Sequence, residues 1–160
     1  MGVIREGGAG ISVSAQPTPE QGTSGVEPPD GAQAKPREEL STIHGRAFLA
    51  ARAALDLKAT DITILDMHEL VTYTDYLLLC TGRSTRQTRR ISEEIIHALK
   101  SSASVVPARV EGQVLGEWIL LDYLDFIVHV FTPGTREFYR LDVLWKAAPA
   151  EAIEAPGAGE

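Results

Sequence analysis

The chain has 160 residues, with 15 Lys and Arg against 22 Asp and Glu, and its formal net charge is -7. An acidic chain of this kind is not expected to bind naked nucleic acid or anionic membranes broadly, because a cationic face supplies most of that affinity. One cysteine excludes an intramolecular disulfide and a thiolate-rich zinc site, and it fits a cytoplasmic location. No apolar stretch is long enough to span a membrane.

The acidic charge is concentrated at the two ends of the sequence. Residues 1–40 hold three basic and six acidic residues, residues 147–160 hold three acidic residues and no basic one, and residues 41–146 are close to neutral. The first forty residues are rich in Gly, Pro and Ser and contain no aromatic residue, so they cannot bury enough surface to offset ordering entropy. We therefore expect a disordered arm at 1–40, one domain at 41–146 and a disordered tail at 147–160.

Within the domain, apolar spacing predicts eight elements in chain order. Ser41 or Thr42 can cap the first helix, and Ser84 with Gln87 forms a capping box before the second. The run from Tyr76 to Cys80 is continuously apolar, as in a strand that is covered on both faces. The expected elements are a helix at 43–55, strands at 62–67 and 76–80, a helix at 85–99, strands at 105–111, 118–122 and 126–131, and a helix at 133–145.

This order predicts an α/β fold, with a mixed sheet of about five strands flanked by helices. The last two strands are close enough in sequence to form a hairpin, and the helix at 85–99 connects strands as a crossover. Pro107 places the strand at 105–111 toward an edge of the sheet, because proline cannot donate a ladder hydrogen bond.

Catalytic and metal-binding patterns are incomplete. His68-Glu69 begins like a zinc-protease motif, but Thr72 stands where the second His is required. The glycine-rich loop of phosphate-binding enzymes is absent, and Cys80 lies in an apolar run where its thiol is inert. Asp residues beside the strands could hold Mg²⁺ as a pair, although they are more commonly turn formers. We expect no cofactor, metal ion or small-molecule substrate.

Two other features leave alternatives open. Arg83, Arg86, Arg89 and Arg90 form a basic patch that is either a solvated face or a contact for phosphate or acidic protein. His129 lies in the middle of a strand, where it is either a buried structural residue or a contact residue on an exposed face.

The last hairpin carries residue types that are enriched at protein interfaces, and further blocks surround it. These blocks are, in chain order, Thr74-Asp75-Tyr76 before a strand that ends at Gly82, then Glu111-Gly112, the run from Trp118 to Phe131, Arg136 with Tyr139, and Leu141-Asp142 with Leu144-Trp145. Several spaced blocks in one order are more specific than any single short motif.

In these blocks, over about residues 43–146, the chain resembles the ribosomal silencing factor family (RsfS, Iojap). The resemblance implies a nucleotidyltransferase-like fold without enzymatic activity. It implies a translational repressor that binds the large ribosomal subunit through large-subunit ribosomal protein fourteen, blocks association with the small subunit, and lowers translation under nutrient limitation. The partner-binding residues that it implies are Trp118, Leu120, Asp122, Tyr123, Asp125, His129, Arg136 and Tyr139.

A secondary ribosome contact is expected at most from Arg83, Arg86 and Arg90. The alternative function is a nucleotide-dependent nucleotidyltransferase-like enzyme, for which the glycine-serine loop is missing. The chain also departs from the family at Leu124, where Gly is usual. Because positive φ costs Leu about 1–2 kcal/mol, we expect a longer turn or a different turn type there.

Overall fold

The computed structural model describes residues 37–157. Residues 1–36 and 158–160, which belong to the arm and tail expected from the sequence, lie outside the described residues. The last four residues of the expected arm form a short helix, α2 (Arg37–Leu40). Helical structure is therefore present in the last four residues of the segment for which the sequence predicts disorder.

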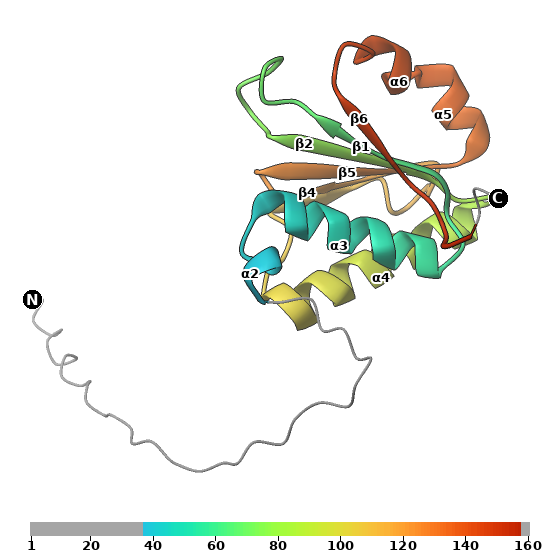
Figure 1. Cartoon of the computed structure of the whole chain (residues 1–160). Helices are drawn as coiled ribbons and strands as arrows, with labels where there is room; N and C mark the ends of the chain where they lie inside the picture. Colours follow the sequence, from blue (N-terminus) through green and yellow to red (C-terminus); the bar gives the residue numbers. More distant parts are fainter. Residues whose placement is uncertain (1–36, 158–160) are drawn as a thin grey trace, which may run out of the picture. The chain divides into compact units, whose positions relative to one another are not determined.

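The domain is built on one mixed sheet with the strand order β3-β4-β5-β2-β1-β6 (Figure 1). The central pair β2 and β5 is parallel, and the other neighbouring strands are antiparallel. The α/β class with a mixed sheet is confirmed, with six strands where about five were expected. The strands are β1 (Thr60–Asp66), β2 (Tyr76–Thr81), β3 (Arg109–Glu111), β4 (Trp118–Asp122), β5 (Phe126–Phe131) and β6 (Ala150–Ile153).

Helices lie on both faces of the sheet. The long helices α3 (Ile43–Asp56) and α4 (Thr85–Ala103) cover one face, and the short helices α5 (Pro133–Tyr139) and α6 (Leu141–Leu144) lie on the other (Figure 1). The larger apolar core lies under α3 and α4, and a smaller core lies under α6. No helix within residues 37–157 is long and apolar enough to cross a membrane.

The capping signals act as the sequence predicts. The Thr42 hydroxyl accepts a hydrogen bond from the Gly45 amide, and the Ser84 hydroxyl accepts one from the Gln87 amide. The Gln87 side chain in turn accepts a bond from the Arg83 amide. These contacts satisfy amides that have no partner inside a helix, so α3 and α4 start at defined residues.

Two expectations near the end of the chain are wrong. The sequence predicts disorder from residue 147, but Ala150–Ile153 pairs with β1 as the edge strand β6. The single closing helix is also interrupted, because Arg140 adopts a left-handed conformation with φ 47° between α5 and α6. Phe138, inside α5, is exposed.

The turn between β4 and β5 also differs from expectation. Leu124 adopts a positive φ of 73°, and the Asp125 amide donates to the Tyr123 carbonyl at 2.8 Å. This is a γ-turn with a positive central φ, which is a strained conformation. The Asp122 carboxylate accepts a hydrogen bond from the Leu124 amide at 2.8 Å. The chain therefore keeps a tight hairpin and holds Leu124 in the conformation that Gly adopts more easily.

Candidate partner-binding face

Four aromatic rings form a cluster on the sheet face that carries α5. The Trp118 ring lies 5.1 Å from Phe131 and 4.6 Å from Tyr139, measured between ring centroids. Phe131 is buried on the neighbouring strand, whereas Tyr139 at the end of α5 is 49% exposed. The Trp118 ring therefore packs against Phe131 and Tyr139, and part of its surface remains accessible to solvent. We call Trp118, His129, Phe131 and Tyr139 the aromatic cluster.

His129 belongs to this cluster as a buried, neutral side chain. The Trp118 Nε1–H donates a hydrogen bond of 3.0 Å to His129 Nδ1, so the proton of the imidazole must lie on Nε2. Burial lowers the pKa of His129 to about 4. Of the two alternatives left open by the sequence, the structural one holds, because His129 orients the indole of Trp118 from the next strand.

An open groove adjoins the aromatic cluster. It has a volume of about 430 Å³, and its walls are the β3–β4 loop on one side and Trp118, Thr135 and Tyr139 on the other. Val114 and Leu115 line the loop side and are 88% and 72% exposed. Isolated exposed apolar residues are common, but several around one groove indicate a contact surface for another macromolecule.

The β3–β4 loop is held in place by α4. The Arg89 guanidinium donates to the carbonyls of Gln113 and Val114, at 2.9 and 2.6 Å. The Thr88 hydroxyl donates to the Gly116 carbonyl. At the start of the loop, Gly112 has φ +87° and a Cβ there would lie 1.9 Å from a backbone oxygen, so only glycine fits. The apolar loop side chains are thus presented from a backbone that is anchored at several points.

Polar groups border the face at the far end of β4. The Arg109 guanidinium on the edge strand donates to the Asp122 carboxylate at 3.0 Å, while the other oxygen of that carboxylate holds the Leu124 amide. Asp125 is exposed at the hairpin turn. Leu120 lies between the two ends of β4, directly opposite His129 in the strand register. An apolar centre with a polar border is the usual arrangement of a protein interface.

Two of the expected contact residues lie elsewhere. Tyr123 is 6% exposed, belongs to the core under α3 and α4, and stacks on Phe126 with 4.8 Å between centroids. Because a buried ring cannot anchor a partner without unfolding the hairpin, we exclude Tyr123 from the candidate surface. Burial also raises the pKa of Tyr123, and its hydroxyl has no hydrogen-bond partner within residues 37–157.

Arg136 forms an internal connection instead of a surface contact. Its guanidinium donates two hydrogen bonds to the Asp142 carboxylate, at 3.1 and 2.8 Å, and one each to the Asp61 carbonyl and the Thr81 hydroxyl. The Arg136 side chain is mostly buried, and its hydrogen bonds hold the pKa of Asp142 below its usual value. Arg136 therefore fixes α5 and α6 against the end of the sheet, which positions Tyr139 indirectly.

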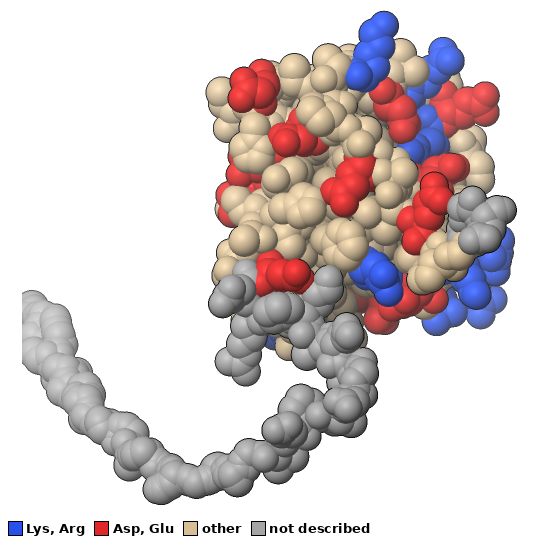
Figure 2. All heavy atoms as spheres, viewed as in Figure 1, with Lys and Arg blue, Asp and Glu red and all other residues tan. Residues whose placement is uncertain are grey.

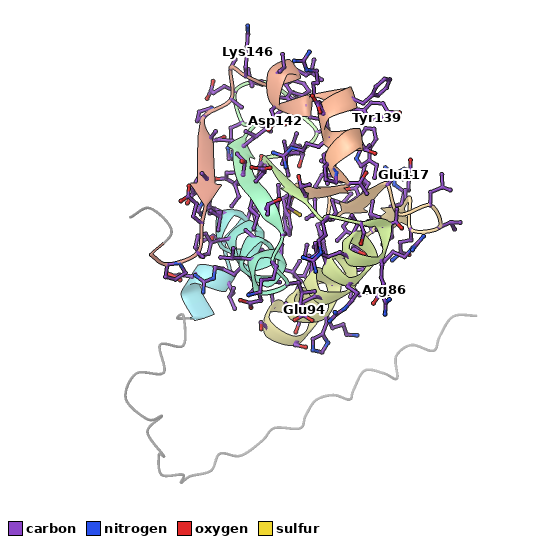
Figure 3. The ribbon with its side chains drawn as sticks, turned by 90° about the vertical axis from the view of Figure 1, so that its right-hand side faces the viewer. Arg86, Glu94, Glu117, Tyr139, Asp142 and Lys146 are labelled. Carbon is purple, nitrogen blue, oxygen red and sulfur yellow. The ribbon has the colours of Figure 1, made fainter. Side chains whose placement is uncertain are left out.

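The remaining expected residues fall into two groups. Trp118, Leu120, His129 and Tyr139 share one face of the molecule, with Asp122 and Asp125 at its border. Arg83, Arg86 and Arg90 are exposed at the start of α4, away from the aromatic cluster. Figure 3 shows Tyr139, Glu117 in the β3–β4 loop and Arg86 following one another down one side of the molecule.

Val114, Leu115 and Phe138 are surface residues that the sequence analysis did not identify. Val114 and Leu115 stand between Gly112 and Gly116, and apolar residues in a short loop between glycines are an available signal of a contact. Phe138 fits a helical core stripe in the sequence, but its ring packs edge-on against Tyr139 at 4.9 Å instead. Tertiary packing decided its position.

Two observations on the described residues concern metal ligands and nucleophiles. Within residues 37–157, no group of three or more His, Cys, Asp or Glu side chains could hold a metal ion. Cys80 is fully buried in β2, and burial raises the pKa of its thiol to about 12, so it is not a nucleophile at neutral pH. The geometry thus directs attention to the groove and the aromatic cluster.

The comparison with known families agrees with this geometry. Residues 41–159 match the model of the family described as "Ribosomal silencing factor during starvation" (RsfS). The chain belongs to the ribosomal silencing factor family. The match includes both long helices, the complete sheet and the aromatic cluster, so the family assignment covers every described element except α2.

Curated relatives and solved structures support the assignment. Ribosomal silencing factor RsfS of Bacillus subtilis is 38% identical over 106 residues, which are 66% of this chain and 89% of that protein. The RsfS of Chromobacterium violaceum is 36% identical over 97 residues. A crystal structure of a Chromobacterium violaceum protein superposes with a TM-score of 0.64 at 30% identity, covering 73% of this chain and 97% of the other. The mouse protein named "Mitochondrial assembly of ribosomal large subunit protein 1" is 29% identical over 89 residues.

Proposed function

We propose that this protein is a translational repressor that binds the large ribosomal subunit through large-subunit ribosomal protein fourteen and blocks association with the small subunit. Membership of the ribosomal silencing factor family supports ribosome-directed repression. The observation that carries the site is the groove whose walls are the anchored β3–β4 loop and the rings of Trp118 and Tyr139.

The character of the groove favours a protein surface as its ligand. Val114 and Leu115 expose apolar side chains on one wall, and Trp118 and Tyr139 supply aromatic surface on the other. Trp and Tyr bury a large area at low entropic cost, and central aromatic residues dominate the free energy of many protein interfaces. In contrast, a small-molecule site needs an enclosed pocket with converging polar groups.

The rigid support of the groove favours tight binding. Trp118 is fixed by the hydrogen bond to His129, and the loop is fixed by Arg89 and Thr88. Less side-chain and loop entropy is then lost on association. Sub-micromolar affinity corresponds to roughly 8 kcal/mol or more. At that affinity, a bound domain excludes the small subunit by volume alone, and no chemical step is required.

The test uses purified ribosomal subunits and two tyrosine variants. Tyr139→Ala removes an exposed ring from the groove, whereas Tyr73→Ala removes a somewhat more exposed ring from the β1–β2 loop. We expect Tyr139→Ala to weaken binding to large subunits by about 2 kcal/mol, as for other interface aromatics, and Tyr73→Ala to have no effect. Sedimentation of large subunits with the protein, followed by addition of small subunits, measures both binding and joining.

The outcomes are distinct. The proposal requires the wild-type chain to sediment with large subunits and to reduce the yield of joined ribosomes in proportion to its binding. Failure of the wild-type chain to bind large subunits would overturn the function. If Tyr139→Ala, shown to be folded by circular dichroism, blocked joining as well as Tyr73→Ala does, then the groove would not be the binding site.

A further inference from the structure

A cationic hollow lies where the end of α3 meets the start of α4. It has a volume of about 440 Å³, and Lys58, Arg83, Arg86 and Arg90 line it together with one acidic residue, Asp56. Lys and Arg side chains gather at the lower right of Figure 2, in the region where α4 begins in Figure 1. The hollow is therefore a local concentration of positive charge on a domain that is close to neutral as a whole.

The side chains of these four cations have no acidic partner among the described residues. In the part of the chain that the structure describes, their side chains make no hydrogen bond and no ion pair. Arg89 on the same helix behaves differently, since its guanidinium donates two hydrogen bonds to carbonyls of the β3–β4 loop. Unpaired like charges around one hollow repel each other, and an anion bound there would relieve that repulsion.

The position of the arginines on α4 is also unfavourable for the isolated helix. No acidic residue stands in the first turn of α4, where Asp and Glu are usually stabilising, and Arg86 and Arg90 occupy its first two turns. Cations near a helix N-terminus oppose the helix dipole. Such a departure from the favourable local pattern is expected where a residue serves a binding function.

We propose that this hollow binds the sugar–phosphate backbone of ribosomal RNA, as a second contact beside the groove. The proposal rests on the proposed function, because a large subunit presents RNA next to its proteins. Guanidinium groups bind phosphate through paired N–H donors. Among the described residues, no aromatic side chain lines the hollow. The hollow would therefore bind the charge of the backbone rather than stack on bases.

The spatial relation of the two sites supports this contact. The β3–β4 loop forms one wall of the groove and is bonded to α4 through Thr88 and Arg89, within one turn of Arg86. Figure 3 shows Tyr139, Glu117 and Arg86 along one side of the molecule. A partner surface that fills the groove therefore continues toward the hollow.

The experiment compares two charge-matched double variants of the full chain. Arg86→Gln with Arg90→Gln removes two charges from the hollow, and Lys100→Gln with Lys146→Gln removes two exposed charges elsewhere. Binding is measured against isolated large subunits and against a short RNA hairpin, over about 50 to 200 mM salt. At low salt, we expect the arginine double variant to bind large subunits and the hairpin about tenfold more weakly than wild type does. Its slope of log affinity against log salt is expected to be smaller by about 2.

Each outcome decides a separate question. Equal affinity and equal salt slope for the two double variants would overturn the RNA contact. Binding of a polyglutamate peptide as tightly as the hairpin would overturn it as well, by showing a site for acidic protein. If the wild-type chain binds the hairpin but not large subunits, the proposed function fails while the hollow remains a phosphate site. A thermal midpoint of the arginine variant at or above that of wild type shows that the variant is folded.

Discussion

Trp118 and His129 are joined across neighbouring strands by a hydrogen bond of 3.0 Å from the indole N–H to Nδ1 of the imidazole. The bond exists only while His129 is neutral, because a protonated imidazole has no acceptor. Burial lowers the pKa of His129 to about 4, so the bond is present throughout the physiological range. The orientation of the Trp118 ring in the groove thus depends on a buried histidine.

This relationship predicts a pH-dependent stability. The unfolded chain binds a proton at His129 near pH 6.5, while the folded chain resists protonation down to about pH 4. The contribution of neutral His129 to the free energy of unfolding is therefore complete above pH 6.5. It falls between pH 6.5 and pH 4, by at most about 1.4 kcal/mol per pH unit. His129→Gln retains an acceptor and does not titrate. Urea unfolding between pH 7.5 and 5 should show a steeper loss for wild type, and parallel curves would contradict the argument.

Arg136 is expected to contribute to stability rather than directly to binding. Arg136→Lys loses the two-point contact with Asp142 and leaves the Thr81 hydroxyl or the Asp61 carbonyl without its donor. We expect a loss of about 2 kcal/mol or more in the free energy of unfolding. Arg52→Lys, on an exposed position of α3, is the control and should lie within about 0.5 kcal/mol of wild type. An unchanged unfolding midpoint for Arg136→Lys would refute this role.

The hairpin turn predicts a stabilising substitution. Leu124 holds a φ of 73°, which costs a non-glycine residue about 1–2 kcal/mol. Leu124→Gly removes that strain but increases the entropy of the unfolded chain, so we expect a net gain of about 0.5–1 kcal/mol. Leu124→Ala keeps the strain and provides the control. Thermal unfolding of both variants separates the two effects, and a destabilised Gly variant would mean that the Leu124 side chain makes a needed contact.

Arg89 is expected to control the mobility of the groove wall. Arg89→Gln removes the donors to the Gln113 and Val114 carbonyls and leaves the rest of α4 unchanged. Amide hydrogen exchange in residues 112–117 should become at least tenfold faster, because a loop without its anchors opens at lower free energy. Arg86→Gln should leave that exchange unchanged, because among the described residues the Arg86 side chain makes no hydrogen bond to the loop. Binding to large subunits should weaken with Arg89→Gln through the entropy of ordering the loop.

Much of the fold could be predicted because its signals are local. Thr42 and Ser84 mark the starts of α3 and α4 by capping chemistry, and the apolar run from Tyr76 marks a strand covered on both faces. The strand β6 could not be predicted in this way. Ala and Glu, which make up three of its four residues, have low strand propensity, and the strand forms by pairing with β1.

The sequence by itself determined the α/β class, the family and the residue types of the contact surface, because these depend on spacing and on the identity of side chains. Only the tertiary structure decided which side chains face outward. Tyr123 and Trp118 belong to the same hairpin, but Tyr123 lies in the core on the sheet face that α3 and α4 cover, whereas Trp118 lies on the opposite face, in the groove. Arg136 likewise became an internal connector because Asp61, Thr81 and Asp142, which are distant in sequence, meet around it. Contacts of this kind follow from the packing of separate elements, which no local pattern encodes.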